Sequence, residues 1–315
     1  MQQLKILSTG SCLPEKVVTN EDMGRIVETN DEWIVTRTGV RQRRWVRQET
    51  NASLAAEAAR RAIARAGAKP EDIAFLVVCT ISAENRVPSV ACQVQRDLGL
   101  PESILAFDLN AACSGFLFGL RAVHGLLLGQ PDKCALLIGS ETLSRVTNFE
   151  DRSTCILFGD GAGAVVAALG QGEGFYTMQG VRGDDRVISC KSAGSDPLGH
   201  PLIHMDGRDT FRFAVDIIPK CIGNVLDQAG LTLEDIDFVV CHQANQRIIA
   251  SVCHRMGAPA EKFFVNIDRC GNTSAASIPL ALDDMAGQGL LGPGKKVICV
   301  GFGGGLTWGA SIIDF

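Results

Sequence analysis

The chain lacks several features that mark large classes of protein. Its twelve cysteines form no C-x-x-C pair, which leaves a zinc ribbon or a thioredoxin-like motif without support. No apolar run reaches membrane-spanning length, and the first ten residues lack a signal-peptide layout. Positive charge is not in excess either, since the net charge is −5. We therefore expect a cytoplasmic protein with reduced thiols and with no nucleic-acid or membrane partner.

The composition that remains is typical of a soluble globular protein. Of the 315 residues, 46% are hydrophobic and 21% are charged. A chain of this length can bury roughly three quarters of the surface that it exposes when unfolded, so a large core is expected. The length is compatible with about two domains or with one large domain.

The stretch from 107 to 129, FDLNAACSGFLFGLRAVHGLLLG, predicts a buried strand, a tight turn and a buried helix. Cys113 falls at the turn, near the amino end of the helix. Unpaired backbone N–H groups and the helix dipole favour a thiolate there, and the thiolate is the nucleophilic form of cysteine. Cys113 is therefore either a nucleophile or a small apolar side chain at a crowded corner.

Two pairs of segments indicate that the chain is duplicated. Residues 62–79 (AIARAGAKPEDIAFLVVC) resemble residues 225–241 (VLDQAGLTLEDIDFVVC), and 158–169 resemble 302–313. Each copy of the first pair predicts a helix that ends at a glycine, a short loop and a buried strand. Two copies are too few for a repeat array, so we expect an α/β protein made of two similar halves.

The boundary between the halves is expected near residue 170. The first half, residues 1–170, then carries Cys113, and the second half, residues 171–315, begins with a linking segment at 171–207. Much of that segment is polar and rich in glycine, aspartate and serine, which predicts a long loop with room for one pair of strands.

Three further candidates lie in the second half. His242 follows the duplicated strand 238–241, and ligand-facing residues of α/β sheets lie beyond the carboxyl ends of strands. Asn272 follows a predicted strand at 263–267, and Gly304 lies in the glycine-rich segment 301–305. Each has a plainer alternative: a histidine bonded to backbone, a Gly–Asn turn, and a hairpin-like turn.

Taken together, these residues suggest one chemistry. A thiolate at Cys113 can accept an acyl group from a thioester, and the backbone N–H groups of Cys113 and Gly304 are candidates for the oxyanion hole. A carbanion beside a thioester carbonyl places charge on that oxygen. Neutral His242 and Asn272 can both donate to it, which suits decarboxylative carbon–carbon bond formation.

These motifs resemble those of the β-ketoacyl-acyl-carrier-protein synthase III family of the thiolase superfamily, over essentially the whole chain. The matching stretches are TNDEWIVTRTGVRQRR (29–44), AACSGF (111–116), FGDGAGA (158–164), HQANQRI (242–248), GNTSAAS (271–277) and GFGGGLTWG (301–309). The resemblance implies a five-layered α/β/α/β/α fold of two duplicated halves and a homodimer. It also implies a reaction: acyl-CoA loads Cys113, malonyl-acyl-carrier protein loses carbon dioxide with His242 and Asn272 stabilising the enolate, and the enolate attacks the acyl-cysteine.

The same resemblance assigns binding roles and implies no permanently bound cofactor or metal, with acyl-CoA as a substrate. Trp33 and Arg152 would sandwich the adenine. The remaining implied CoA contacts are Thr29, Arg37, Gly207 and Asn245. The implied contacts to the acidic carrier protein are Arg212, Gln243, Ala244, Asn245, Gln246 and Arg247. Arg43, Arg44 and Arg47 are expected to form a solvated, charged face.

One position departs from the family pattern. Val87 stands before Pro88, where well-studied members that take acetyl groups carry phenylalanine. That side chain is expected to reach the acyl pocket of the partner subunit. Because valine is smaller, the pocket is predicted to accept branched or longer starters as well as acetyl groups.

Other functions on the same fold remain alternatives. A biosynthetic thiolase needs a second cysteine base, and none stands out near Gly303. A chalcone-synthase-like enzyme is normally longer and lacks the tryptophan and arginine pair. The main alternative is a specialised starter-unit condensing enzyme or acyltransferase of a polyketide or secondary-metabolite pathway. A non-catalytic homologue that binds carrier protein is disfavoured by the intact Cys113, His242 and Asn272.

Overall fold

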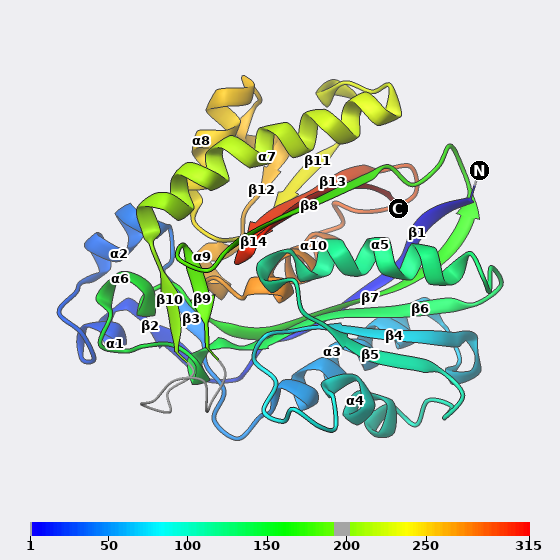
Figure 1. Ribbon diagram of the computed structural model, residues 1–315, viewed down its shortest axis with the longest axis horizontal. Helices are drawn as coiled ribbons and strands as arrows, with labels where there is room; N and C mark the ends of the chain where they lie inside the picture. Colours follow the sequence, from blue (N-terminus) through cyan, green and yellow to red (C-terminus); the bar gives the residue numbers. More distant parts are fainter. Residues whose placement is uncertain (1, 192–201) are drawn as a thin grey trace.

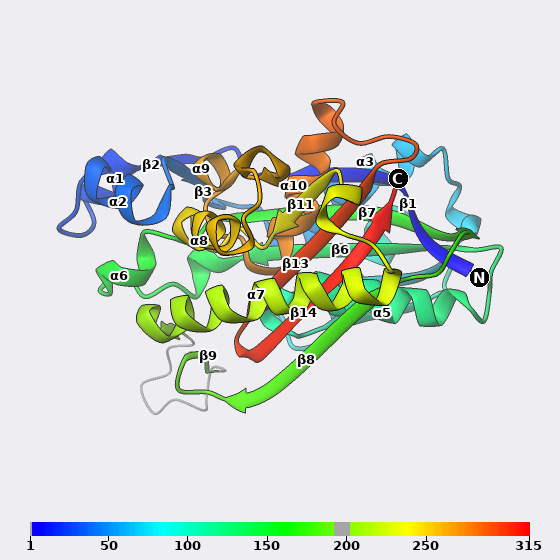
Figure 2. The ribbon, with the colours of Figure 1, turned by 90° about the horizontal axis from the view of Figure 1, so that it is seen from above.

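A computed structural model describes residues 2–191 and 202–315 of the chain. It has five layers, in which two groups of β-strands alternate with three layers of helices (Figure 1). Figure 2 shows that the two chain ends lie at the same end of the molecule. The α/β/α/β/α fold of two duplicated halves predicted from the sequence is confirmed.

Each half contributes five strands in the same order and with the same directions. In the first half the order is β1 (Gln2–Cys12), β7 (Asp160–Gln171), β6 (Cys134–Thr142), β4 (Ile73–Cys79) and β5 (Leu105–Leu109). In the second it is β8 (Thr177–Asp184), β14 (Gly305–Asp314), β13 (Lys296–Gly303), β11 (Phe238–Cys241) and β12 (Phe263–Phe264). In both, the first two pairings are antiparallel and the last two are parallel. A parallel contact between β1 and β14 joins the halves into one sheet.

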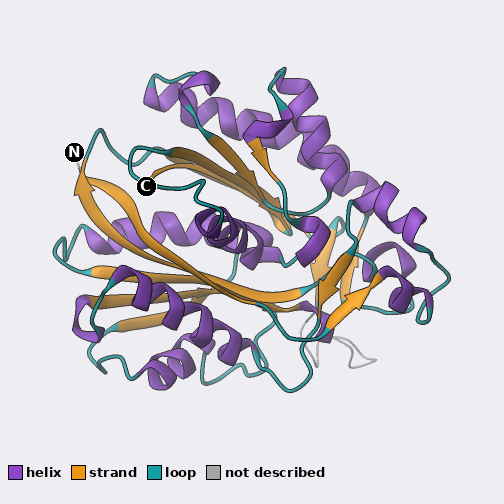
Figure 3. Ribbon diagram, turned by 180° about the vertical axis from the view of Figure 1, so that it is seen from behind, coloured by secondary structure: helices purple, strands orange, loops and turns teal. Residues whose placement is uncertain are grey.

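The helices form the other three layers, as Figure 3 shows from behind. The central pair, α5 (Gly115–Leu127) and α10 (Ser277–Gly287), packs against strands of both halves. The outer layers are α3 (Asn51–Ala66) with α4 (Val90–Leu98), and α7 (Gly207–Ala229) with α8 (Gln246–Met256). A central helix has protein on both sides, which explains why the α5 sequence is apolar on most of its faces.

Local sequence signals explain where the duplicated helices begin and end. The side chain of Thr50 caps α3, and Asp206 caps α7 by accepting the N–H groups of Arg208 and Asp209. Both helices end at a glycine in the left-handed region, Gly67 with φ 63° and Gly230 with φ 65°. The two predicted C-cap glycines are thus confirmed, and the cap at Asp206 starts α7 at Gly207.

Smaller elements lie over the open end of the sheet. They are α1 (Asn20–Gly24), α2 (Asp31–Thr38), α6 (Arg152–Cys155), α9 (Ile267–Cys270), the strand pair β2 (Val17–Thr19) and β3 (Gln42–Arg44), and the pair β9 (Ile188–Cys190) and β10 (Ile203–Met205). The β9–β10 pair is the one allowed for within the predicted linking segment. Residues 192–201 of that segment, including His200, lie outside the described residues.

The predicted charged face is wrong at Arg43. Its side chain is fully buried and donates to the Asn20 side chain and to the carbonyls of Val18 and Ile156. These acceptors replace the water that the guanidinium loses, and burial lowers the pKa of Arg43 to about 10. Arg44 is half-buried, whereas Arg47 is exposed as expected.

The two halves meet so closely at Gly139 that a methyl group does not fit. A Cβ built there lies 2.3 Å from the carbonyl oxygen of Ala275 in the other half. We expect Gly139→Ala to lower the free energy of unfolding by about 1–3 kcal/mol, because backbone must move to admit the methyl group. Urea unfolding followed by circular dichroism measures the change.

The matched control is Gly223→Ala in α7, where nothing lies within 4 Å of the added atom. Alanine is favoured over glycine inside a helix by about 1 kcal/mol, so this variant should be as stable as the parent or more stable. Equal stability of the parent and Gly139→Ala would show that the contact between the halves tolerates a side chain.

Candidate active site

One cavity of about 700 Å³ opens where the carboxyl ends of strands from both halves meet the small elements. Cys113, His242 and Asn272 all line it, although they are far apart in the chain. Gly304 lines it as well. The sequence predicted that these four residues would share one site, and the structure brings them together.

Cys113 lies in a short 3-10 turn, Ala112–Ser114, directly before α5. The residue before it, Ala112, has a φ of 48°, in the left-handed region that non-glycine residues rarely adopt. The turn is held in place by the Thr307 hydroxyl, which donates to the Ala111 carbonyl at 3.0 Å. A Cβ on Gly303 would lie 2.7 Å from the Cys113 nitrogen, so only glycine lets β13 approach the nucleophile turn.

The ionisation of Cys113 differs from the prediction. The helix dipole was expected to favour the thiolate, but burial raises the pKa of the Cys113 thiol to about 11. The nearby Ser274 hydroxyl favours the thiolate and opposes this effect in part, while the charge of Glu141 adds to it. Removal from water thus outweighs the influences that favour the anion, and the resting side chain is a thiol.

His242 follows β11 and is 2% exposed. Its Nδ1 lies 2.7 Å from the Ser277 hydroxyl, which also accepts the Gln243 N–H at 3.4 Å. We therefore assign the hydroxyl proton to the bond with Nδ1, which leaves Nε2–H as a donor. Phe302 packs edge-on against the ring, and burial lowers the pKa of His242 to about 3, so the imidazole is neutral at physiological pH.

Asn272 is also held as a donor. Its backbone N–H donates to the Leu157 carbonyl at 2.8 Å, and its carbonyl accepts the Gly159 N–H at 3.0 Å. Its side-chain oxygen accepts the Ser274 N–H at 2.9 Å. Because the oxygen is already engaged, the amide NH₂ is the group left for a ligand in the cavity.

Four of the residues predicted to contact CoA line the cavity as well. Trp33, Arg37, Gly207 and Asn245 line it. The guanidinium groups of Arg37 and Arg152 lie 4.4 Å and 4.9 Å from the centre of the Trp33 ring, so Trp33 and Arg37 of the cavity wall form a cationic and aromatic cluster with Arg152. Thr29 lies just before α2, and its hydroxyl is buried without a hydrogen-bond partner among the described residues.

Of the residues predicted to contact the carrier protein, some are exposed and others are buried. Arg212, Gln246 and Arg247 are exposed, and Arg247 lies over the ring of Phe211. Gln243 is 1% exposed, and its amide bonds to the carbonyls of Cys241 and Phe264. Ala244 is buried too and lines the cavity. Gln243 and Ala244 therefore offer almost no outer surface to a docked protein, so the structure does not support the implied carrier-protein contacts at these two positions.

Three further expectations concern Val87, metal binding and membrane-spanning helices. Val87 is 84% exposed, lies in the segment just before α4, and is not among the described residues that line the cavity. No cluster of three or more histidine, cysteine or acidic side chains suited to a metal ion occurs within residues 2–191 and 202–315. None of the helices in those ranges has the length and apolarity needed to cross a lipid bilayer.

Sequence reasoning missed Ser277, Ser274 and Glu141. Ser277 orients His242, and Ser274 fixes the amide of Asn272. Glu141 is fully buried at the carboxyl end of β6. The rule that drew attention to His242, a polar residue directly after a buried strand, would also have found Glu141.

Comparison with known proteins agrees with this geometry. A family model described as 3-oxoacyl-[acyl-carrier-protein (ACP)] synthase III matches residues 107–180, and the model of its C-terminal part matches 226–315. A β-ketoacyl-[acyl-carrier-protein] synthase III from Clostridium acetobutylicum is 44% identical, over 100% of this chain and 99% of its own. One from Acholeplasma laidlawii is also 44% identical, over 99% of this chain and 98% of its own.

Solved structures give the same result. The crystal structure of 3-oxoacyl-[acyl-carrier-protein] synthase III from Aquifex aeolicus has a TM-score of 0.92 and 40% identity, covering 99% of this chain and 100% of its own. The priming β-ketosynthase of the R1128 polyketide pathway has a TM-score of 0.93 and 32% identity, covering 100% and 96%. The chain therefore belongs to the β-ketoacyl-acyl-carrier-protein synthase III family, the condensing acyltransferases that start fatty-acid synthesis.

Proposed function

We propose that the enzyme transfers an acyl group from acyl-CoA to Cys113 and condenses it with malonyl-acyl-carrier protein. The observation that carries the proposal is the shared cavity, in which one thiol faces two neutral side chains whose acceptor atoms are already occupied. Two donors without negative charge suit an enolate oxygen, which a carboxylate in their place would repel.

In the loading step, the Cys113 sulfur attacks the thioester carbonyl and CoA leaves. The backbone N–H groups of Cys113 and Gly304 are the proposed oxyanion hole. Cys113 precedes the first turn of α5, where N–H groups have no partner within the helix, and Gly304 has no side chain to cover its own. In the condensing step, His242 Nε2–H and the Asn272 amide hold the enolate oxygen while carbon dioxide leaves.

We assign binding roles to individual residues, first for CoA and then for the acyl-carrier protein. Trp33, Arg37 and Arg152 are proposed to hold the adenine end of CoA, with support from the cluster that they form, and Asn245 and Gly207 to line its path. Thr29 remains a predicted CoA contact. For the acidic carrier protein, the exposed residues Arg212, Gln246 and Arg247 are proposed to carry the contact, because arginine attracts carboxylates across a surface.

We also propose that the enzyme is a homodimer and acts in the cytoplasm. Strand β5 is the outermost strand of the first half, and Leu105 on it is 49% exposed. An exposed edge strand beside exposed apolar side chains is suited to a second copy of the chain. Val87 lies just before α4, which packs against β5, and would reach the partner in such a dimer.

A specialised starter-unit enzyme is the second candidate. It is favoured by the similarity to the priming β-ketosynthase of the R1128 polyketide biosynthetic pathway. The two candidates share the same chemistry and differ in the acyl group that they accept.

The loading and condensing roles separate by mutation. Cys113→Ser should abolish formation of the acyl-enzyme, because a serine hydroxyl is a far weaker nucleophile than a thiolate. His242→Ala should leave loading within about tenfold of the parent while lowering malonyl decarboxylation by about 10²–10³-fold. Intact-protein mass spectrometry after mixing with acyl-CoA measures loading, and carbon dioxide release measures decarboxylation. Acyl transfer to Cys113→Ser at the parent rate, or none to the parent protein, would contradict the proposal.

The pKa of His242 predicts how the rate of decarboxylation changes as the pH is lowered. Since that pKa is lowered to about 3, the imidazole stays neutral from pH 8 to pH 5. The rate of carbon dioxide release should change by less than about threefold over this range, whereas an ordinary histidine would protonate near pH 6.5. A fall centred near pH 6.5 that disappears in His242→Asn would show that the imidazole is not held neutral.

The preference among acyl-CoA substrates tests the prediction that Val87 leaves a larger acyl pocket. Isobutyryl-CoA should support kcat/KM within about tenfold of acetyl-CoA, because one or two methylenes in an apolar pocket change binding by about 1–3 kcal/mol. Val87→Phe should lower the value for isobutyryl-CoA more than that for acetyl-CoA. Exposed Val181, at 71%, gives a matched control in Val181→Phe. Strict acetyl preference in the parent protein would refute the larger pocket.

A further inference from the structure

Arg43 is the one arginine or lysine that is buried among the described residues, and the proposed reaction has given it no role. Its side chain in β3 is fully buried, and its acceptors are one side-chain amide and two backbone carbonyls, none of them charged. A guanidinium that leaves water for neutral acceptors lowers the stability of the fold unless other contacts compensate. The burial of this charge therefore points to something that its bonds hold in place.

The shortest of these bonds reaches the wall of the catalytic cavity. Arg43 Nη2 donates to the Ile156 carbonyl at 2.6 Å. Trp45, directly after β3, is also buried and donates its indole N–H to the Phe158 carbonyl at 3.2 Å. Residues 156–158, here called the wall segment, all line the cavity. Two buried side chains from one hairpin therefore hold one stretch of the cavity wall.

The wall segment in turn holds Asn272. The Leu157 carbonyl accepts the Asn272 N–H at 2.8 Å, and the Asn272 carbonyl accepts the N–H of Gly159, the next residue after the segment, at 3.0 Å. Phe158 and Asn272 also form a parallel β-bridge. Both backbone groups of Asn272 are thus bonded to this one stretch of chain, so the place of its side-chain amide in the cavity depends on where that stretch lies.

Little free space separates Arg43 from the chain on either side of it. A Cβ added to Gly271, the residue before Asn272, would lie 3.1 Å from the Cβ of Arg43, and one added to Gly159 would lie 3.3 Å from it. In an interior packed this closely, a displaced side chain has to move the backbone beside it. A change at Arg43 should therefore reach Asn272.

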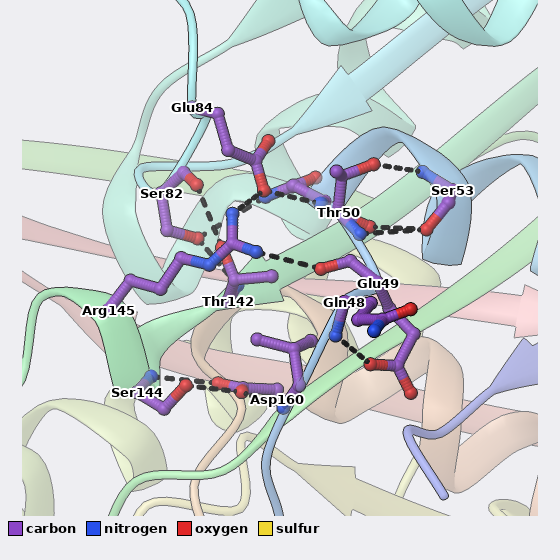
Figure 4. A network of polar contacts seen from close by, with 12 residues as sticks. Gln48, Glu49, Thr50, Ser53, Ser82, Glu84, Thr142, Ser144, Arg145 and Asp160 are labelled. Carbon is purple, nitrogen blue, oxygen red and sulfur yellow. Dashed lines mark hydrogen bonds and ion pairs between the residues drawn. The ribbon is translucent and has the colours of Figure 1, made fainter.

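The chain after Trp45 has an anchor of its own. Val46 donates its N–H to the Asp160 carboxylate at 2.8 Å, and Asp160 also accepts the N–H and the hydroxyl of Ser144. Figure 4 shows Asp160 and Ser144 in this arrangement. Loss of the Arg43 bonds should therefore loosen the wall segment locally and leave the β2–β3 hairpin attached to the rest of the protein.

The nucleophile is held by different elements. The Thr307 hydroxyl donates to the turn that carries Cys113, and Gly303 of β13 lies against the same turn. These contacts come from the second half of the chain and do not pass through β3. A change at Arg43 should therefore affect the Asn272 amide while the thiol keeps its place.

We propose that Arg43, together with Trp45, positions the Asn272 amide for the condensing step by holding the wall segment; this rests on the proposed function. Arg43 is a positioning residue, because neither it nor Trp45 is among the described residues that line the cavity. It acts through the backbone bonds that join the wall segment to Asn272. A side chain in the first half of the chain thus sets the place of a donor in the second half.

The test compares the two partial reactions in Arg43→Met, which keeps an unbranched side chain and removes every donor. Carbon dioxide release from malonyl-acyl-carrier protein should fall by about 10- to 10²-fold, mainly in kcat, because a small displacement of a catalytic group has an effect of this size. Single-turnover loading by acetyl-CoA, measured by intact-protein mass spectrometry, should stay within about threefold of the parent. Arg43→Lys should give an intermediate rate of carbon dioxide release, because lysine keeps the charge but not the forked donors.

Trp45→Phe tests the second bond, and it carries the test if Arg43→Met fails to fold. Phenylalanine keeps an aromatic ring and removes the indole N–H. Carbon dioxide release should fall by about threefold to tenfold, the size expected for one hydrogen bond, with loading unchanged. Thermal unfolding checks that each variant is folded at the assay temperature.

A double variant separates positioning from a general loss of stability. If Arg43 acts through Asn272, Arg43→Met should have little further effect once the amide is gone. Asn272→Ala with Arg43→Met should therefore release carbon dioxide within about twofold of the rate of Asn272→Ala alone. A purely structural role for Arg43 would instead lower loading and decarboxylation together and would add to the effect of Asn272→Ala.

Arg44→Met is the matched control. Arg44 is the next residue of β3, but its guanidinium donates to the carbonyls of Pro14 and Glu15 rather than to the wall segment. The same substitution in the same strand should leave both partial reactions within about twofold of the parent.

The outcomes are distinct. Parent-like carbon dioxide release by folded Arg43→Met or Trp45→Phe overturns the proposal, and so does an equal fall in loading and decarboxylation. A double variant that is tenfold slower than Asn272→Ala overturns it too. Parent-like carbon dioxide release by Asn272→Ala itself contradicts the proposed function instead. Slow decarboxylation with normal loading in both single variants, and no effect of Arg44→Met, supports the proposal.

Discussion

The active site depends on backbone contacts in which glycine lets one half of the chain touch the other. Gly303 of β13 lies against the Cys113 nitrogen, and Gly139 of β6 lies against the Ala275 carbonyl. Each glycine belongs to the half opposite the turn that it touches. A side chain at either position would separate the halves, and with them the thiol and the two donors. The catalytic geometry is therefore a consequence of how the two copies pack.

Duplication also shows which residue of the other half corresponds to each catalytic residue. The sheet pairs Phe75 with Ala135 in the first half and Phe238 with Val297 in the second. Counting from these pairs places Cys79 in the position of His242. The turns Ala112–Ser114 and Ser274–Ala276 correspond as well, and their first residues share a φ of 48°. The nucleophile of one turn is thus alanine in the other, and the histidine at one strand end is a buried cysteine at the other.

The sequence predicted the parts of the site that follow from local rules. Cys113 and His242 each come shortly after a strand, and the carboxyl ends of strands meet at one end of such a sheet. The strand predicted at 263–267 before Asn272 is shorter in the structure, Phe263–Phe264, and the helix α9 lies between it and Asn272. The glycine caps at Gly67 and Gly230 were readable because only the backbone is involved. The repeated segments were sufficient to predict two similar α/β halves, since they depend on short stretches of chain, whereas the five layers were implied by the resemblance to the family.

Properties that depend on the packed environment could not be predicted from the sequence. The dipole argument for Cys113 was local, whereas the pKa of its thiol is governed by burial in the assembled cavity. Arg43 looks like a surface charge in a run of arginines, yet its acceptors come from Val18 and Ile156, which are distant in the chain. Gln243 lies beside His242 in sequence but points into the protein, because the Phe264 carbonyl accepts its amide.

The same burial accounts for the chemical character of the site. An environment that keeps His242 neutral makes it a donor for an enolate, and it also makes the Cys113 thiol reluctant to ionise. Burial therefore favours the condensing step and hinders the loading step.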